Sequence, residues 1–218
     1  MSNFDWGIIV RSWPFLAEGM ALSLLLVAVA TAGGLVLGFG LALMRRSDRV
    51  FINVPATAYV TVMRTVPLIL VLFWFYFLVP LVIGRPVGSL AAALIAFVMF
   101  EAAFYCEIIR AGMASVRNGQ IEAAMATGMR PWQVMRHVIM PQGLRAMRPL
   151  LFNQVIIVFQ DTSLVYVVAL RDFMTTASVV AARDGRPTEM YSLVAVVYLA
   201  ICYSLSKVVE HYSKDRSR

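Results

Sequence analysis

Long apolar runs without a single charged residue constrain this chain more than any other feature. Residues 19–44 contain no Asp, Glu, Lys or Arg, and neither do residues 65–84. A helix of about 20 such residues crosses the hydrocarbon core of a bilayer, which is roughly 30 Å thick. The whole chain is 61% hydrophobic and 14% charged, whereas soluble domains have about 25% charged residues. The sequence therefore predicts an integral membrane protein.

Five hydrophobic spans are expected, at residues 19–44, 59–83, 88–110, 149–170 and 190–210. Because no internal repeat or linker is visible, residues 1–218 are predicted to form one membrane domain, an all-α bundle of five transmembrane helices. In the first span, Gly33-Gly34 and Gly38-Phe39-Gly40 place small residues where another helix can approach closely. Residues 4–17 suggest a short amphipathic segment at the membrane surface, and residues 171–189 suggest a polar loop.

The basic residues predict the orientation of these spans. Five spans put the two chain ends on opposite sides of the membrane. With the N-terminus outside, fourteen basic residues lie inside and five lie outside, namely Arg11, Arg85, Arg171, Arg183 and Arg186. Cytoplasmic loops carry an excess of Lys and Arg, so we expect N-out and C-in, with residues 111–148 in the cytoplasm. The same distribution explains the net charge of +7 without nucleic-acid binding.

One polar segment with high helix propensity interrupts the apolar spans, and we call it the elbow (residues 119–141). Residues 120–127 favour a helix, and Glu122 in its first turn suits the positive end of the helix dipole. Gly128 can turn left-handed and end that helix. Pro131 suits the start of a second helix and Pro141 its end. The expectation is two short helices, each roughly 12–15 Å long, folded back at a glycine as a binding element for a partner.

Charged residues inside the third span are candidates for function. Glu101 and Glu107 would lie at membrane depth, where charges are costly and usually face protein or water. The alternative is that Glu107 simply pairs with Arg110, one turn later. Cys106 and Cys202 have neither disulfide nor metal-ligand spacing, so no metal site is expected.

The fourth span has a polar face. Asn153 and Gln160 are seven residues apart, as are Gln154 and Asp161, which puts the four side chains in two layers about 10 Å apart. Asp161 lies roughly 20 Å along the helix from Arg148, well within the hydrocarbon. Such a face either lines a polar path or makes hydrogen bonds between helices, and the sequence leaves both open.

The elbow resembles the EAA loop of ABC importer permeases. That family has the pattern E-A-A, three residues, G, nine residues, I-x-L-P, and this chain has Glu122-Ala123-Ala124, Gly128 and Val138-Ile139-Met140-Pro141 at the same spacing. In the family this segment sits in a cleft of the ATPase subunit. The resemblance therefore implies that Glu122, Ala123, Ala124, Gly128 and Pro141 couple the chain to an ATPase. The alternative is an ordinary cytoplasmic loop with this spacing by chance.

Further segments resemble the permeases of polar amino acid importers. They are Arg64-Thr65-Val66-Pro67-Leu68, Glu107-Ile108-Ile109-Arg110-Ala111-Gly112, Phe100-Glu101-Ala102-Ala103-Phe104-Tyr105, Phe159-Gln160-Asp161-Thr162-Ser163-Leu164 and Arg183-Asp184-Gly185. Together they are most similar to the permease subunits of glutamate/aspartate importers. Many relatives have lysine before the D-T-S-L, where this chain has Gln160.

The resemblance implies a transport subunit of the bacterial inner membrane, which is not itself an enzyme. The implied partners are an ABC ATPase subunit, a second permease subunit (identical or a paralogue) and an extracytoplasmic amino-acid-binding protein. ATP and Mg²⁺ would be bound by the ATPase, because this chain has no G-x-x-x-x-G-K-[ST] and no cofactor site of its own. The candidate substrate path consists of Arg64, Glu101, Asn153, Gln154, Gln160, Asp161, Thr162 and Ser163.

Three alternatives remain at this stage. The same machine could carry another polar amino acid. An ion-coupled secondary transporter would use Glu101, Glu107 and Asp161 as ion sites, but it predicts internal repeats that are not visible. A membrane-anchored assembly protein would explain the spans and the elbow but not the polar face. An acidic substrate also needs positive charge near these carboxylates, for which Arg64 and Arg171 are the candidates.

Overall fold

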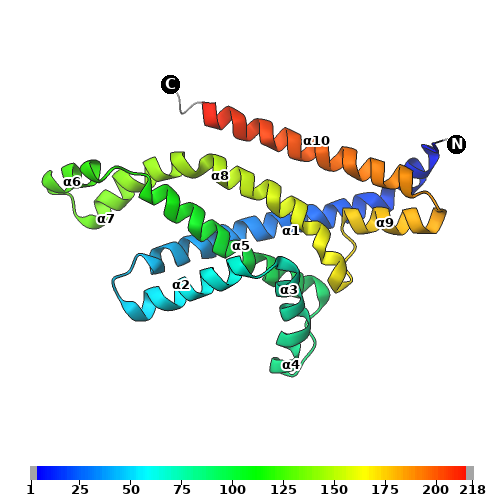
Figure 1. Cartoon of the computed structure of the whole chain (residues 1–218), viewed down its shortest axis with the longest axis horizontal. Coiled ribbons are helices and arrows are strands. Elements are labelled where there is room, and N and C mark those ends of the chain that lie inside the picture. Colours follow the sequence, from blue (N-terminus) through cyan, green and yellow to red (C-terminus); the bar gives the residue numbers. More distant parts are fainter. Residues whose placement is uncertain (1–3, 215–218) are drawn as a thin grey trace.

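The computed structural model describes residues 4–214, and all regular structure in that range is helical (Figure 1). The elements are α1 (Gly7–Arg45), α2 (Val50–Thr65), α3 (Leu68–Phe73), η1 (Trp74–Leu78), α4 (Val79–Ile83), α5 (Ser89–Ala114), α6 (Asn118–Ala126), α7 (Pro131–Val134), η2 (Met135–Ile139), α8 (Met140–Asp161), η3 (Thr162–Val168), α9 (Phe173–Asp184) and α10 (Pro187–Lys214). Within this range four helical segments are long and apolar enough to cross a membrane, or five if one bent pair counts as a span. The predicted all-α class is confirmed.

Helix α1 packs against α5, and the small residues of α1 make this contact possible. A Cβ atom at Gly34 would lie 2.9 Å from Cβ of Glu101, and one at Gly38 would lie 2.8 Å from the carbonyl oxygen of Ala102. The two backbones therefore approach more closely than larger side chains permit. The predicted role of Gly34 and Gly38 in helix contact is confirmed.

Residues 4–17 do not form the separate short segment that the sequence predicts. Residues from Gly7 onward continue without a break into the first span as part of α1. Ile8 and Leu16 are buried against Phe173 and Ala177 of α9. Helix α9 therefore covers one side of this stretch, whereas Trp6, Val10 and Trp13 stay exposed.

The continuous second span predicted at residues 59–83 is also wrong. Helix α2 and the helical segment from Leu68 to Ile83 meet at an angle of 110°. Val66 at the break is extended, with φ −92° and ψ 136°. A proline disfavours helical backbone at the residue before it, so Pro67 explains the break. Figure 1 shows α3 and α4 turning away from the long helices.

Residues 171–189 contain a helix rather than the predicted polar loop. The side chain of Asp172 accepts hydrogen bonds from the backbone N–H groups of Met174 and Thr175 and so caps the start of α9. Gly185, with φ 64°, ends the helix in the left-handed conformation. Both are common helix-end signals.

The elbow forms as predicted at Gly128 but not at Pro141. Gly128 has φ 83° and separates α6 from α7, as expected. Helix α6 begins at Asn118, so Glu122 lies in its second turn rather than the first. Pro141 does not end the second helix, because the helical backbone continues from Pro131 through η2 into α8. Pro141 lies directly after the wide π-helical turn η2, where the regular α-helical hydrogen-bond pattern is already interrupted, so a residue without an N–H group fits there.

Candidate functional site

A buried hydrogen bond joins α5 to α8 in the interior of the molecule. Glu101 is 0% exposed, and its Oε2 accepts a hydrogen bond of 2.9 Å from Nε2 of Gln154. Its other oxygen, Oε1, has no hydrogen-bond partner among the described residues. A buried carboxyl group with an unused oxygen is costly unless something else satisfies it. Because Glu101 is fully buried, its hydrogen bond with Gln154 joins two helices and does not face an open path.

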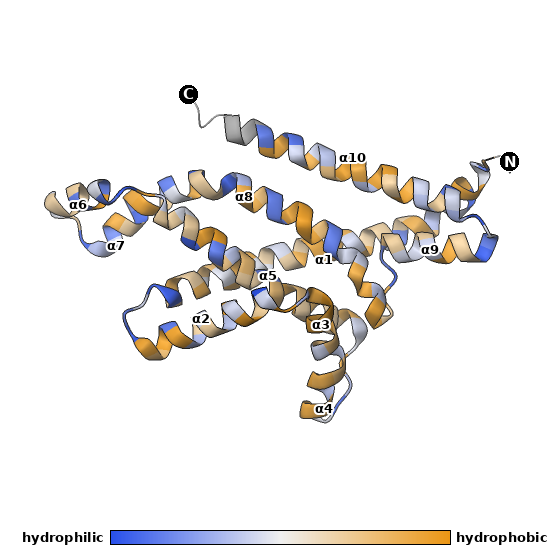
Figure 2. Ribbon diagram, viewed as in Figure 1, coloured by the Kyte–Doolittle hydropathy of each residue, from blue (hydrophilic) through white to orange (hydrophobic). Residues whose placement is uncertain are grey.

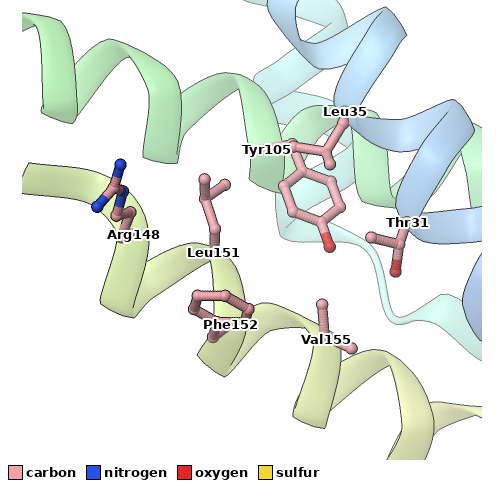
Figure 3. Close-up of a pocket in the computed structure, with 7 residues that line it drawn as sticks. All are labelled: Thr31, Leu35, Tyr105, Arg148, Leu151, Phe152 and Val155. Carbon is pink, nitrogen blue, oxygen red and sulfur yellow. The ribbon is translucent and has the colours of Figure 1, made fainter. Parts of the chain in front are cut away.

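A cavity of about 490 Å³ is lined partly by the same two helices but by neither Glu101 nor Gln154, and we call it the membrane cavity. Its lining residues come from α1, α5 and α8, and they are Thr31, Leu35, Tyr105, Arg148, Leu151, Phe152 and Val155. Figure 3 shows the hydroxyl groups of Tyr105 and Thr31 toward one end and the guanidinium of Arg148 toward the other, with apolar side chains between them. An apolar cavity of this size with a few polar groups is typical of a small-molecule site.

None of these seven lining residues belongs to the predicted substrate path, and three of them, Thr31, Tyr105 and Arg148, are polar. Tyr105 lies four residues after Glu101 on the same helix, so their shared face was a signal that could have found it. Arg148 was counted only as a cytoplasmic charge. Thr31 gave no signal beyond its place next to small residues in α1.

The predicted polar face of α8 is divided in the structure. Gln154 points inward to Glu101, which is the interhelical hydrogen bond that one of the two alternatives predicted. Asn153 is exposed, and Gln160 is exposed with its Nε2 3.8 Å from Sγ of Cys202 on α10. Asp161 is half-buried at the end of α8. The inner side of this face thus meets α5, and the outer side remains uncovered within this chain.

The two hydroxyl residues after Asp161 bond to their own helix. Oγ1 of Thr162 donates to the carbonyl oxygen of Phe159 at 2.8 Å, and Oγ of Ser163 donates to that of Gln160 at 2.8 Å. Thr162 is buried, whereas Ser163 is half-buried. Neither lines the membrane cavity.

Arg64 lies in an ion-pair cluster and not in the membrane cavity. Glu107 accepts hydrogen bonds from Arg45 of α1 and from Arg110 of α5, the latter with an N–O distance of 2.8 Å. The guanidinium of Arg64 on α2 is 3.5 Å from the same carboxylate and lies over the ring of Phe104. The predicted pair between Glu107 and Arg110 is confirmed, but no sequence pattern indicated that α1 and α2 also contribute arginines.

The elbow presents a mostly exposed surface. Glu122, Ala123 and Gly128 are exposed, whereas Ala124 is buried against Val134 and Ile139 and holds α6 on the following helical turns. Pro141 is exposed at the start of α8. Figure 2 shows polar residues gathered at the elbow and at the turn between α1 and α2, with apolar residues dominating the long helices.

Comparison with known proteins gives consistent similarities. The family described as binding-protein-dependent transport system inner membrane component matches residues 31–218. The glutamate/aspartate import permease protein GltK of Escherichia coli O6:H1 is 45% identical over 221 aligned positions, which cover 98% of this chain and 99% of the relative. The glutamine transport system permease protein GlnP of Escherichia coli is 32% identical, with 97% of each chain covered.

Solved structures agree in fold. A structure titled "Crystal structure of an amino acid ABC transporter with histidines" has a TM-score of 0.90 and 29% identity, covering 98% of this chain and 99% of that one. An inward-facing structure of the MetNI methionine ABC transporter has a TM-score of 0.67 at 20% identity, covering 97% and 99%. The second likeness shows the fold alone.

Proposed function

Because the chain belongs to the family of binding-protein-dependent transport system inner membrane components, we propose that it is the permease subunit of an ATP-driven importer of glutamate and aspartate. The observation that carries this proposal is the 45% identity to GltK across 98% of the chain. The protein is a multi-pass protein of the inner membrane, as its relatives are. It carries the solute, and a separate subunit hydrolyses the nucleotide.

The proposed topology has five spans, with the N-terminus outside and the elbow in the cytoplasm. The excess of arginine at one end of the spans supports this orientation. In this arrangement the exposed Glu122, Ala123 and Gly128 contact an ABC ATPase, which binds ATP and Mg²⁺. The elbow is continuous with α8, so movement of the ATPase reaches a helix that lines the membrane cavity.

The membrane cavity is the proposed substrate path in this subunit. A glutamate or aspartate molecule carries one ammonium and two carboxylate groups. The hydroxyl oxygens of Thr31 and Tyr105 at one end of the cavity suit the ammonium, and the guanidinium of Arg148 at the other end suits a carboxylate (Figure 3). Arg148 thus provides the positive charge that an acidic solute needs in this cavity, whereas the predicted Arg64 and Arg171 do not line it.

Three further partners belong to the proposal. A chain with at most five spans leaves much of its apolar surface uncovered, including Val36 on α1, Leu150 on α8 and Leu199 on α10. A second permease subunit, identical or a paralogue, and the lipid bilayer cover these surfaces. An extracytoplasmic amino-acid-binding protein delivers the solute.

A glutamine importer is the second candidate, because the chain is 32% identical to GlnP over 97% of its length. The two candidates differ in the charge of the solute and share the same machinery. Arg148 in the membrane cavity can pair with the α-carboxylate of either solute, so it is the higher identity to GltK that favours the acidic amino acids.

The test is uptake by the reconstituted complex. The chain is co-purified with its ATPase and binding protein, placed in liposomes, and assayed for ATP hydrolysis and uptake of glutamate, aspartate, glutamine and histidine. We expect vanadate-sensitive uptake of the two acidic amino acids that proton and sodium ionophores leave unchanged. Uptake by the chain without an ATPase, or uptake abolished by ionophores, would reject the proposal in favour of an ion-coupled carrier. Preference for glutamine would support the second candidate.

A further inference from the structure

A second, smaller pocket lies between the C-terminal ends of α1 and α5, and we call it the basic pocket. It measures about 190 Å³ and is lined by Ala42, Arg45, Arg46, Arg110, Met113 and Ala114. It is separate from the membrane cavity, with which it shares no lining residue. Half of its lining is arginine and the other half is apolar. Nothing in the proposed transport of amino acids uses it.

The charge of the basic pocket is strongly positive even after its ion pairs are counted. Glu107 pairs with Arg45 and Arg110 and lies 3.5 Å from Arg64, so one carboxylate faces three guanidinium groups. Arg46 adds a further cation and makes no ion pair among residues 4–214. The pocket thus keeps an excess of positive charge, which favours an anionic ligand.

The helix ends do not cancel this charge. The C-terminal end of a helix carries roughly half a negative charge, and the ends of α1 and α5 both lie at this pocket. Together they oppose an anion with about one unit of charge, which is less than the excess that the arginines supply.

The apolar half of the pocket narrows the class of ligand. Ala42, Met113 and Ala114 line the pocket where α1 and α5, two helices able to cross a membrane, reach their ends. A ligand that satisfies both halves has a charged phosphate next to hydrocarbon. Basic pockets between transmembrane helices are known to hold anionic lipid headgroups in general.

We propose that the basic pocket binds the headgroup of an anionic phospholipid, with the phosphate on Arg46, Arg45 and Arg110 and the start of an acyl chain on Met113 and Ala114. The phosphate lies beside Glu107, so Arg45 and Arg110 bind both the phosphate and the Glu107 carboxylate. This proposal does not depend on which solute the protein carries.

The experiment compares lipids on the purified complex. The complex is stripped of lipid in detergent and titrated with phosphatidylglycerol or with phosphatidylethanolamine, and bound lipid is measured by native mass spectrometry together with the melting temperature. We expect tighter binding of phosphatidylglycerol and a higher melting temperature with it. Inorganic phosphate and glycerol phosphate at the same concentration should not displace the lipid. Displacement by them at equal concentration would identify a free-phosphate site and overturn the proposal.

Three variants locate the binding. Arg46→Gln removes a cation that makes no ion pair and should weaken phosphatidylglycerol binding about five-fold, the effect of one basic residue at a membrane surface. Ala114→Leu narrows the pocket without a change of charge and should weaken binding as well. Arg85→Gln is the matched control, since Arg85 is an exposed arginine outside this pocket, and should bind like the unmodified protein. Equal binding by all three variants would overturn the assignment.

Discussion

Replacement of Gly128 by leucine tests the elbow most directly, because the structure separates its two possible effects. Gly128 has φ 83°, and a Cβ atom placed there would meet nothing within 4 Å. The isolated chain therefore has room for a side chain, and the intrinsic cost is only that of left-handed backbone. That cost is roughly 1–2 kcal/mol for a residue with a Cβ atom, a factor of about 5–30 in the population of the native turn.

A cost of this size leaves the membrane spans folded, since native proteins are typically stable by about 5–15 kcal/mol. If the elbow lies in a cleft of an ATPase, however, the leucine side chain meets the partner at a site that is empty in the isolated chain. We therefore expect Gly128→Leu to lower uptake per ATP hydrolysed by at least about ten-fold, equivalent to about 1.4 kcal/mol. The melting temperature of the complex should change little.

The assay measures uptake and ATP hydrolysis in the same proteoliposomes. Two variants serve as controls. Gly128→Asn tolerates the left-handed conformation and separates backbone strain from side-chain volume. Gly119→Leu adds the same side chain elsewhere on the elbow, where nothing lies within 4 Å and no positive φ is required. Normal transport by Gly128→Leu would refute the role proposed for the elbow, and equal loss by both leucine variants would show that volume anywhere on the elbow is harmful.

Three further tests follow from the packing, two of them with a comparison variant. Gln154→Leu removes the only hydrogen bond described for the Glu101 carboxyl group and should lower the free energy of unfolding by about 1–3 kcal/mol, whereas Glu101→Gln should lower it less. Thermal unfolding in detergent checks both, and a Gln154→Leu variant as stable as the unmodified protein would contradict the buried contact. Gly38→Leu should prevent folding, because its Cβ would lie 2.8 Å from a backbone carbonyl oxygen of α5. Gly40→Leu should be tolerated, since nothing lies within 4 Å of a Cβ at that position, and the yield of monodisperse protein distinguishes the two variants. Glu107→Ala should lower the free energy of unfolding by about 2–3 kcal/mol, because it leaves Arg45 and Arg110 without their carboxylate. An unchanged melting temperature would show that solvent already screens these charges.

Hydrophobic length and helix-end residues made most of the helices predictable, and the failures have identifiable physical causes. The turn at Gly128 depends on local backbone preference, so it was readable from the sequence. The break at Pro67 was marked by a proline, but an uncharged apolar run outweighed that local signal. The helix after Asp172 was missed because a polar composition was given more weight than its capping residues.

The site was less predictable than the fold, because its contacts join distant segments. The contact between Glu101 and Gln154 spans 53 positions in the sequence, and periodicity along one helix cannot reveal its partner on another. The spacing of polar residues on α8 predicted a polar face but not which members would be covered. In the sequence Arg148 only adds to the excess of basic residues on the cytoplasmic side, although its side chain lines the membrane cavity.

The unbroken helical backbone from Pro131 to Asp161 has a mechanical consequence. With no loop between the two ends, a displacement applied near Pro131 either tilts the whole rod or bends it at the widened turn of η2 or at Pro149 inside α8. Stiffening that turn should shift the balance toward tilting, so that Gln154 and the far end of the rod travel further for the same push.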